Sequence, residues 1–317
     1  MLYIFMGKKR IFISSTGRTA TQFFAQYLNL MIENSSSIHE PGTPWVSKPR
    51  RLLTQIKSYG LYHLTLGQNK NTHSMYKLSR DYVKGCISPQ KACENILSIN
   101  KKVDELYNTD VMVYSSGHIY GLLGLLDEVY DEANFVFIIR DPRDWIGSAL
   151  NKMEYSLYGP VEFFLRELSL QPSCFDDDPY KDSWKKLSKF EKYCWFYNKL
   201  NTMVLETMKD KPNFKVFRYE DIFLSENCVE NFGNLLEFST QFKTGKINYT
   251  YKSELIGEKI DSKQKSKTWR NWTKEEAKIM MKHCGTLMNE YGYGKEEEWK
   301  KKIGIKKLNV KKKLVVT

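Results

Sequence analysis

Three patterns are missing from the 317-residue sequence, and each absence excludes a class of protein. The six cysteines form no C-x-x-C pair and no zinc-site spacing with histidine, so we expect free thiols in a reducing compartment. No apolar run reaches the roughly 18 residues of a membrane span, and Gly7-Lys8-Lys9-Arg10 interrupts the short apolar start. We therefore expect a soluble, cytoplasmic protein with no cleaved signal and no stable membrane insertion.

The third missing pattern is the nucleotide-binding loop G-x-x-x-x-G-K-[ST]. Its absence argues against an ordinary ATPase or GTPase, and against a P-loop small-molecule kinase, which would also need an aspartate to hold Mg²⁺ after a strand. A sizeable core can form, because 41% of the residues are hydrophobic and 14% are aromatic. The formal net charge of +12 suits an anionic ligand, a nucleic acid or an acidic membrane surface, although the Lys-rich C-terminal segment carries much of it.

Apolar runs alternate with helix-period segments along the chain, which predicts an α/β fold with a central parallel sheet and helices on both faces. Strands are predicted at 10–14, 111–114, 135–139 and 214–218, with a short one near 36–39. Helices are predicted at 20–33, 118–130, 143–153, 187–209, 226–236 and 273–290. The run at 135–139 is continuously apolar, as expected for a central strand that is covered on both sides.

Residues 1–295 are expected to form a single domain that contains two variable segments. Residues 43–108 are weakly periodic and rich in Lys, Ser, Thr, Tyr and Asn, which predicts irregular helices over the sheet edge. Residues 154–186 hold two Pro-containing turns and an acidic run, which predict a mobile excursion or lid. Residues 296–317 form a Lys-rich tail, for which we expect disorder or a surface helix.

Small polar residues separate the first predicted strand from the helix that follows it. The stretch reads Ser15-Thr16-Gly17-Arg18-Thr19-Ala20-Thr21-Gln22. A loop in this place presents unpaired backbone N–H groups at the positive end of the helix dipole, and Gly17 lets the backbone approach a ligand closely. The stretch therefore predicts a phosphate- or sulfate-binding loop, with a plain helix N-cap by Ser or Thr as the alternative.

A second informative stretch, FVFIIRDPRDWIGSALN, covers residues 135–151. The predicted strand ends in Arg140, and Ser148 follows about two helical turns into the next helix. Ligands of open α/β sheets bind at the carboxyl ends of strands, so the first loop and Arg140 are placed to face one ligand. The alternative for Arg140 is a structural ion pair with Asp141 or Asp144.

Together the two stretches resemble the sulfotransferases that use 3′-phosphoadenosine 5′-phosphosulfate (PAPS). In that family the first loop commonly reads (Lys/Arg)-Ser-Gly-(Ser/Thr)-(Ser/Thr) and binds the 5′-phosphosulfate; residues 17–22 take its place, and Arg18 matches the basic residue that holds the transferring group. Arg140 and Ser148 match the family's pair for the 3′-phosphate. Ala20 stands where the family usually has Gly, which argues against a positive φ there.

Three later stretches also resemble the family. The stretch with Arg218 and Tyr219 is similar to its RYEDL strand end, where Tyr219-Glu220-Asp221 is expected to be structural. Lys265, Lys267, Thr268 and Trp269 resemble a late loop that closes over the adenosine and its 3′-phosphate, although core packing is an open alternative for Trp269. His39-Glu40-Pro41 resembles the "EP" of carbohydrate-type and many bacterial members, in which the glutamate is the expected base.

The resemblance implies a P-loop NTPase-like sulfotransferase fold and the transfer of a sulfuryl group from PAPS to a hydroxyl or amine. The acceptor would be a small molecule or a glycan, the product 3′,5′-ADP, and no metal would be required. Glu40 is the first candidate base, with His39 and His118 as alternatives, and Arg18 would stabilise the leaving phosphate. The rival interpretations are the kinase and a non-enzymatic protein that binds nucleic acid or an acidic membrane. The sequence leaves the acceptor and the oligomeric state open.

Overall fold

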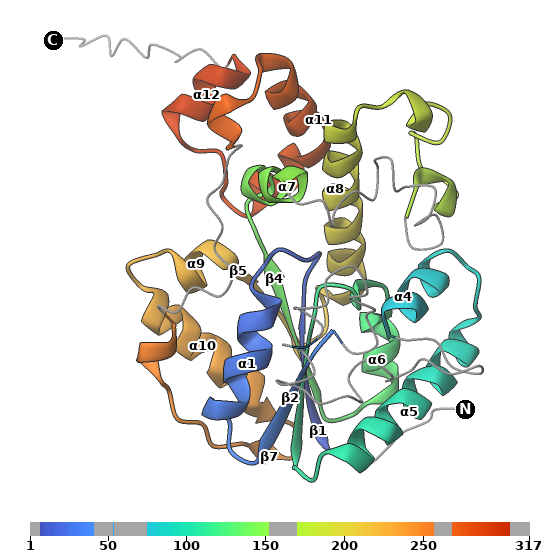
Figure 1. Cartoon of the computed structure of the whole chain (residues 1–317), viewed down its shortest axis with the longest axis vertical. Coiled ribbons are helices and arrows are strands. Elements are labelled where there is room, and N and C mark those ends of the chain that lie inside the picture. The colour runs from blue at the N-terminus through green and yellow to red at the C-terminus, as the bar shows by residue number, and fades with distance from the viewer. Residues whose placement is uncertain (1–6, 41–52, 54–74, 152–169, 257–267, 305–317) are drawn as a thin grey trace, which may run out of the picture.

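The centre of the fold is a five-stranded parallel sheet in the order β2-β3-β1-β4-β5 (Figure 1). The computed structural model describes residues 7–40, 53, 75–151, 170–256 and 268–304. The strands are β1 (Lys9–Ser14), β2 (Ser35–His39), β3 (Val111–Ser116), β4 (Ala133–Ile139) and β5 (Phe214–Arg218), and a small hairpin pairs β6 (Gln241–Phe242) with β7 (Gly245–Lys246). The α/β class with a parallel sheet is confirmed.

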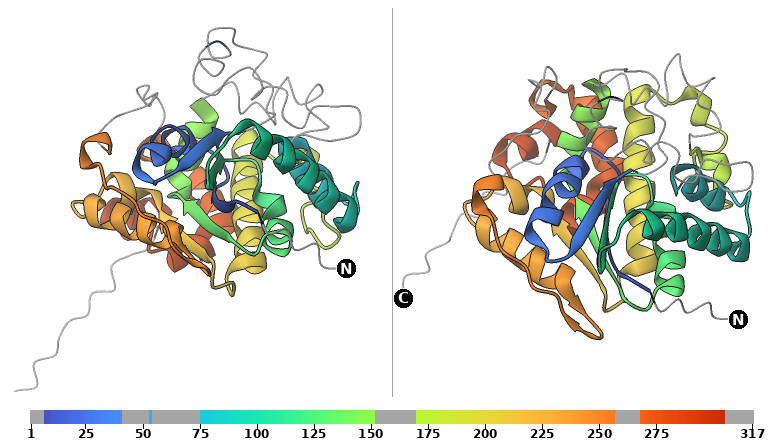
Figure 2. Two further views of the ribbon diagram at one scale, coloured as in Figure 1. Left: turned by 90° about the horizontal axis from the view of Figure 1, so that it is seen from below. Right: turned by 60° about the horizontal axis from the view of Figure 1, so that its bottom comes forward.

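Helices cover both faces of this sheet (Figures 1 and 2). Their bounds are α1 (Thr21–Met31), α4 (Met75–Val83), α5 (Pro89–Leu106), α6 (Leu123–Val129), α7 (Pro142–Asn151), α8 (Lys189–Met208), α9 (Tyr219–Phe223), α10 (Cys228–Thr240), α11 (Lys274–Glu290) and α12 (Glu297–Ile303). Helices α1 and α10 lie on one face, and α5, α6 and α8 lie on the other. Helices α7, α11 and α12 lie beyond the carboxyl ends of the strands, at the top of Figure 1.

Successive side chains along a strand point to opposite faces, which divides the core into two apolar layers. On β1, Phe12 belongs to the layer under α5, α6 and α8, whereas Ile11 and Ile13 belong to the layer under α1 and α10. Every residue of β4 is buried, as expected for a strand covered on both sides. Because all five strands run parallel, their carboxyl ends meet at one edge of the sheet.

The predicted strands match the observed ones closely, and the short strand predicted near 36–39 is β2. The predicted helix at 118–130 begins instead with a 3₁₀ turn, Tyr120–Leu122, that precedes α6. No helix in the described ranges is both long enough and apolar enough to cross a membrane.

The prediction of irregular helices at 43–108 is wrong for the part that the structure describes, because α4 and α5 are regular α-helices. Helix α5 begins at a favourable cap, where the Ser88 side chain accepts a hydrogen bond from the Lys91 N–H and Pro89 occupies the first turn. It buries a stripe with helical spacing, formed by Ala92, Ile96, Ile99 and Val103. Residues 43–52 and 54–74 lie outside the described residues.

Two segments that were predicted to be loosely held pack on the core where they are described. In the predicted excursion at 154–186, the Trp195 Nε1–H donates to Asp178 Oδ2 at 3.0 Å, and Trp184 is buried. In the predicted tail, α12 buries Trp299 to 1% exposure, edge-on to Trp269 and Trp272. The surface-helix alternative is therefore confirmed for 297–303, where Trp299 is the buried residue of the helix, and the alternative of disorder is wrong there. Residues 152–169 and 305–317 lie outside the described residues.

Candidate functional site

The loop between β1 and α1 passes through left-handed backbone conformations. Gly17 has a φ of 84°, Arg18 of 59° and Ala20 of 61°. The expectation that alanine at position 20 argues against a positive φ is therefore wrong, although the conformation costs a non-glycine residue about 1–2 kcal/mol. Left-handed residues within a turn direct successive N–H groups toward one concave side, which is a common way to bind an anion.

Buried side chains hold this loop in shape. Ser15 Oγ accepts hydrogen bonds from the Gly17 N–H at 3.0 Å and the Thr19 hydroxyl at 2.6 Å. Trp145 Nε1–H donates to the Gly17 carbonyl at 2.8 Å. Ser15, Thr16 and Thr19 are each at most 4% exposed, and Ser15 and Thr19 bond to one another within the loop.

The two arginines predicted from distant stretches lie in one hydrogen-bonded network. Arg140 Nη1 donates to the Arg18 carbonyl at 2.6 Å, and Arg18 Nε donates to Ser148 Oγ at 2.9 Å. The Arg140 guanidinium also stacks on the ring of Tyr219, with its carbon 4.5 Å from the ring centroid. The carboxyl ends of β1 and β4 therefore bring two cations together, beside the Ser148 hydroxyl from the second turn of α7.

Arg140 is a buried cation without a counterion in the described part of the chain. It is 8% exposed, no carboxylate of the described residues lies within ion-pair distance, and its Nε has no hydrogen-bond partner there. Asp141 is bound instead by Arg143, whose Nη2 lies 2.5 Å from Asp141 Oδ2. Arg140 therefore does not form the structural ion pair with Asp141 or Asp144 that the sequence left as an alternative. Burial of a guanidinium costs free energy unless an anion compensates it, so this arrangement suits a bidentate phosphate or sulfate.

Glu40 lies beside the same loop, directly after β2. Its side chain is 6% exposed, and Oε1 lies 3.6 Å from His118 Nε2 and 3.9 Å from His39 Nε2. Its backbone adopts a φ of 45°, and its N–H donates to the Ser115 carbonyl at 3.0 Å. The structure thus brings all three candidate bases within reach of one another.

The two histidines differ in their surroundings. Burial lowers the pKa of His39 to about 3 and that of His118 to about 4, so both imidazoles are neutral near neutral pH. His39 Nε2 lies 3.2 Å from Thr21 Oγ1 and ties β2 to the start of α1. The side chain of His118 keeps 17% exposure and packs edge-on against the ring of Tyr76 at 4.4 Å. Of the two imidazoles, that of His118 is therefore the more accessible to a bound molecule.

The loops that carry Arg18 and His118 touch through two glycines. A Cβ atom at Gly117 would lie 2.7 Å from Gly17 Cα and 3.0 Å from Gly17 N. The Gly117 N–H also faces Glu40 Oε1 at 3.4 Å. The close approach thus joins the anion-binding loop to the candidate base.

We expect Gly117→Ala to displace the loop and to lower the free energy of unfolding by about 1–3 kcal/mol, because a methyl group has no space there. Binding of 3′,5′-ADP should weaken in parallel, as measured by calorimetry. Gly233→Ala is the matched control, since a Cβ there meets no atom within 4 Å and α10 should gain helix propensity. Unchanged nucleotide binding in Gly117→Ala would show that the loop tolerates the shift.

Of the remaining predicted residues, those that the structure describes make no hydrogen bond, ion pair or ring contact with Arg18, Arg140 or Glu40, and the others lie outside the described residues. Trp269 is 6% exposed, with the guanidinium carbons of Arg143 and Arg270 at 4.8 and 4.6 Å from its ring centroid, so it packs in the core, and Thr268 precedes it. Arg218 stacks on Tyr293 at the end of β5. Gln22 is partly exposed in the first turn of α1. Lys265 and Lys267 lie outside the described residues.

Sequence reasoning missed Trp145, Tyr197 and the contact role of Gly117. Tyr197 donates its hydroxyl to the Arg140 carbonyl at 2.5 Å. These contacts join positions that lie 57 or more residues apart in the chain, and no local pattern marks them. The glycines at positions 17 and 117, each directly after a predicted strand, are the one sequence signal that could have indicated the contact between these loops.

Fold and site together define an α/β protein with two buried or partly buried arginines at the carboxyl edge of its sheet and a buried carboxylate–imidazole pair beside them. No family model matches the chain, and no curated protein matches it with statistical significance. Among solved structures, the chain is similar to a sulfotransferase from Alicyclobacillus acidocaldarius, with 11% identity, 93% of this chain and 100% of that chain covered, and a TM-score of 0.43.

Two further solved structures are similar at the same low level. The sulfotransferase domain from the curacin biosynthetic pathway has 14% identity and a TM-score of 0.38, with 80% of this chain and 78% of that one covered. The sulfotransferase domain from the Synechococcus PCC 7002 olefin synthase has 15% identity and a TM-score of 0.33, with 74% of each chain covered. Because these identities and TM-scores are low, the similarities carry no conclusion about function, which has to come from the side chains described above.

Proposed function

We propose that the chain is a sulfotransferase that uses PAPS as donor and a hydroxyl or amine of a small molecule or glycan as acceptor. The observation that carries the proposal is the buried Arg140 guanidinium, which has no carboxylate partner among the described residues and lies against a loop of left-handed backbone. A buried guanidinium beside a loop of left-handed backbone would suit a nucleotide with two separated phosphate groups, as PAPS has.

On the donor side, Arg140 and Ser148 would hold the 3′-phosphate by charge-assisted hydrogen bonds. Arg18 and the backbone N–H groups of 17–21 would hold the 5′-phosphosulfate and stabilise charge on the leaving phosphate. The donor supplies an activated sulfuryl group, so the chain has only to bind, align and manage one proton. The hydrogen bond from Arg18 Nε to Ser148 Oγ supports two subsites that would lie next to each other.

On the acceptor side, Glu40 and His118 are the residues that would receive the acceptor's proton. With an Nε2 proton directed at Glu40 Oε1, the His118 ring has Nδ1 left to accept a proton, and the carboxylate stabilises the imidazolium that forms. His39 is occupied by Thr21 and would serve as a support for β2 and α1. Glu40 alone would act as base if the acceptor reaches its carboxylate directly.

The test is ligand-specific thermal stabilisation of the purified chain. At a concentration 100-fold above its Kd, 3′,5′-ADP should stabilise the fold by about 2.7 kcal/mol, whereas 5′-AMP and ADP at the same concentration should give a much smaller shift in Tm. The reason is that only 3′,5′-ADP offers a phosphate to Arg140. Equal shifts for the three nucleotides would favour the kinase or the nucleic-acid-binding alternative.

A further inference from the structure

The peptide bond that follows Arg140 is held at both of its polar groups by side chains from elsewhere in the fold. The Arg140 carbonyl accepts a hydrogen bond from the Tyr197 hydroxyl at 2.5 Å. The Asp141 N–H donates to Glu220 Oε1 at 2.9 Å. These two bonds fix the direction in which the chain leaves β4, and therefore the direction of the Arg140 side chain.

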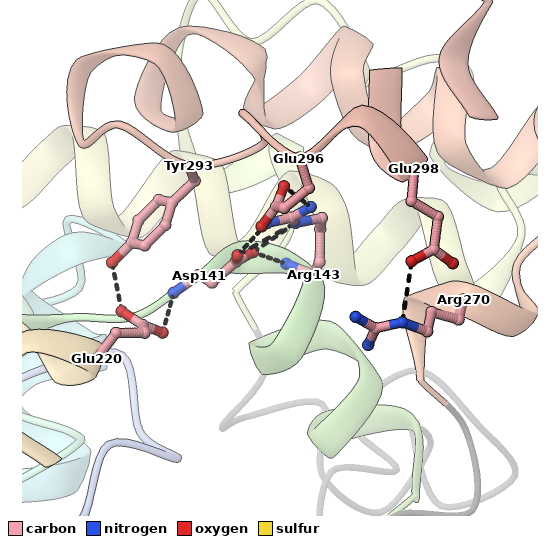
Figure 3. A network of polar contacts seen from close by, with 7 residues as sticks. All are labelled: Asp141, Arg143, Glu220, Arg270, Tyr293, Glu296 and Glu298. Atoms are coloured by element: carbon pink, nitrogen blue, oxygen red, sulfur yellow. Dashed lines mark hydrogen bonds and ion pairs between the residues drawn. The ribbon is translucent and has the colours of Figure 1, made fainter. Parts of the chain in front are cut away.

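A residue near the C-terminus completes the Glu220 contact (Figure 3). The Tyr293 hydroxyl donates to Glu220 Oε2 at 2.8 Å, and Tyr293 is 6% exposed. Burial raises the pKa of Glu220, while the bonds from Asp141 and Tyr293 favour its charged form. Without the Tyr293 hydroxyl, one oxygen of a mostly buried carboxylate would lose its donor.

A second residue of the same segment reaches Asp141 through Arg143 (Figure 3). Arg143 Nε lies 3.0 Å from Asp141 Oδ1, and both terminal nitrogens of Arg143 donate to Glu296 at 2.8 Å. Arg143 is 1% exposed, with its guanidinium carbon 4.8 Å from the ring centroid of Trp269. The bond to Arg143 also lowers the pKa of Glu296, so the pair stays charged.

We propose that Tyr293 and Glu296 are positioning residues for nucleotide binding. Tyr293 holds the 140–141 peptide through Glu220, and Glu296 holds the Asp141 side chain through Arg143, so the C-terminal segment sets how Arg140 meets the 3′-phosphate. Neither residue belongs to the loop or the helix that would touch the nucleotide. The proposal rests on the proposed function, because it takes Arg140 as the 3′-phosphate ligand. A guanidinium binds a phosphate well only when its supports keep it within about half an ångström of the productive place.

The experiment measures Kd by calorimetry for 3′,5′-ADP and for 5′-AMP, on the full chain and on Tyr293→Phe and Glu296→Gln. We expect each substitution to weaken 3′,5′-ADP by about fivefold and to leave 5′-AMP unchanged, since only the 3′-phosphate depends on Arg140. Glu298→Gln is the matched control. Glu298 lies on the same segment but pairs with the exposed Arg270 at 3.1 Å, away from the 140–141 peptide, so its loss should leave both Kd values unchanged (Figure 3).

A double-mutant cycle separates positioning from general support of the fold. In an Arg140→Ala background, Tyr293→Phe should have no further effect on the Kd of 3′,5′-ADP, because the group that it positions is gone. In steady-state assays, Tyr293→Phe should raise the KM for PAPS by the same fivefold while kcat stays near its original value. Tyr293→Phe keeps the buried ring and therefore the packing around it. It keeps the test decisive even if Glu296→Gln destabilises the fold and lowers Tm.

Wild-type affinity for 3′,5′-ADP in both variants would overturn the inference, and so would an equal loss for 5′-AMP. If the unmodified chain itself binds both nucleotides alike, the proposed function fails and takes this inference with it. If instead the unmodified chain prefers 3′,5′-ADP to 5′-AMP and both variants keep that preference, only the positioning role is overturned.

Discussion

Replacing Arg140 by methionine is expected to weaken 3′,5′-ADP binding by about 100-fold while the Tm of the empty protein stays the same or rises. The affinity falls because the substitution removes a buried charge that would pair with the 3′-phosphate, a loss typically worth about 2–5 kcal/mol. Stability holds because the guanidinium is 8% exposed and has no carboxylate partner among the described residues, so its burial is a cost in the empty state. Calorimetry gives the affinity, and thermal unfolding without ligand gives the Tm.

Arg143→Met is the matched control, since Arg143 lies three residues away and is also buried, at 1% exposure. It has two carboxylate partners, Asp141 and Glu296, at 2.5 and 2.8 Å. Removing one member of a buried ion pair typically costs about 3–5 kcal/mol, so Arg143→Met should lower Tm markedly. A comparable drop in Tm for Arg140→Met, with nucleotide binding retained, would make Arg140 a structural residue.

Glu40→Gln is expected to lower kcat by about 10²- to 10⁴-fold with little change in the Kd of 3′,5′-ADP. The amide keeps the size of the carboxylate but can neither accept the acceptor's proton nor stabilise a protonated His118. His118→Asn should give a loss of similar order if the pair acts as a unit, and the double variant should be little worse than either single one. Initial rates with PAPS and a productive acceptor, together with calorimetry, provide both measurements.

His39→Asn supplies the contrast for this pair. His39 is 6% exposed and contacts Thr21, so its replacement should lower Tm while kcat changes only a few-fold. Full activity in Glu40→Gln would remove the carboxylate from the mechanism. A large loss of kcat in His39→Asn at unchanged Tm would move the base to His39.

Local sequence patterns predicted the sheet well because a strand covered on both faces needs an uninterrupted apolar run. The run that ends at Ile139 shows this, since every residue of β4 is buried. The approach of Arg140 and Ser148 to the first loop was readable in part, because a strand end followed by about two helical turns limits where the two residues can lie. The structure brings both residues into contact with Arg18 at the carboxyl edge of the sheet, where the sequence predicted the candidate site.

The errors have a common physical origin, which is that distant contacts outweigh local preference. Ala20 adopts a left-handed conformation in a loop that Trp145 contacts from α7 and Gly117 contacts from the end of β3. Trp299 attaches an otherwise largely exposed helix to the core inside a Lys-rich stretch, where composition left disorder and a surface helix as equal alternatives. Neither contact leaves a trace at short range in the sequence, since the partners lie on separate elements.

The packing of α12 also bears on how the chain can be shortened. A fragment designed by composition would stop where the lysines begin, at about residue 296, and would discard the tryptophan that sits against the 269–272 turn. Such a fragment would expose the apolar rings of Trp269 and Trp272 that Trp299 covers, so it would be expected to aggregate. Protein engineers who wish to remove the basic end should cut after Gly304, where the helix terminates in a left-handed residue.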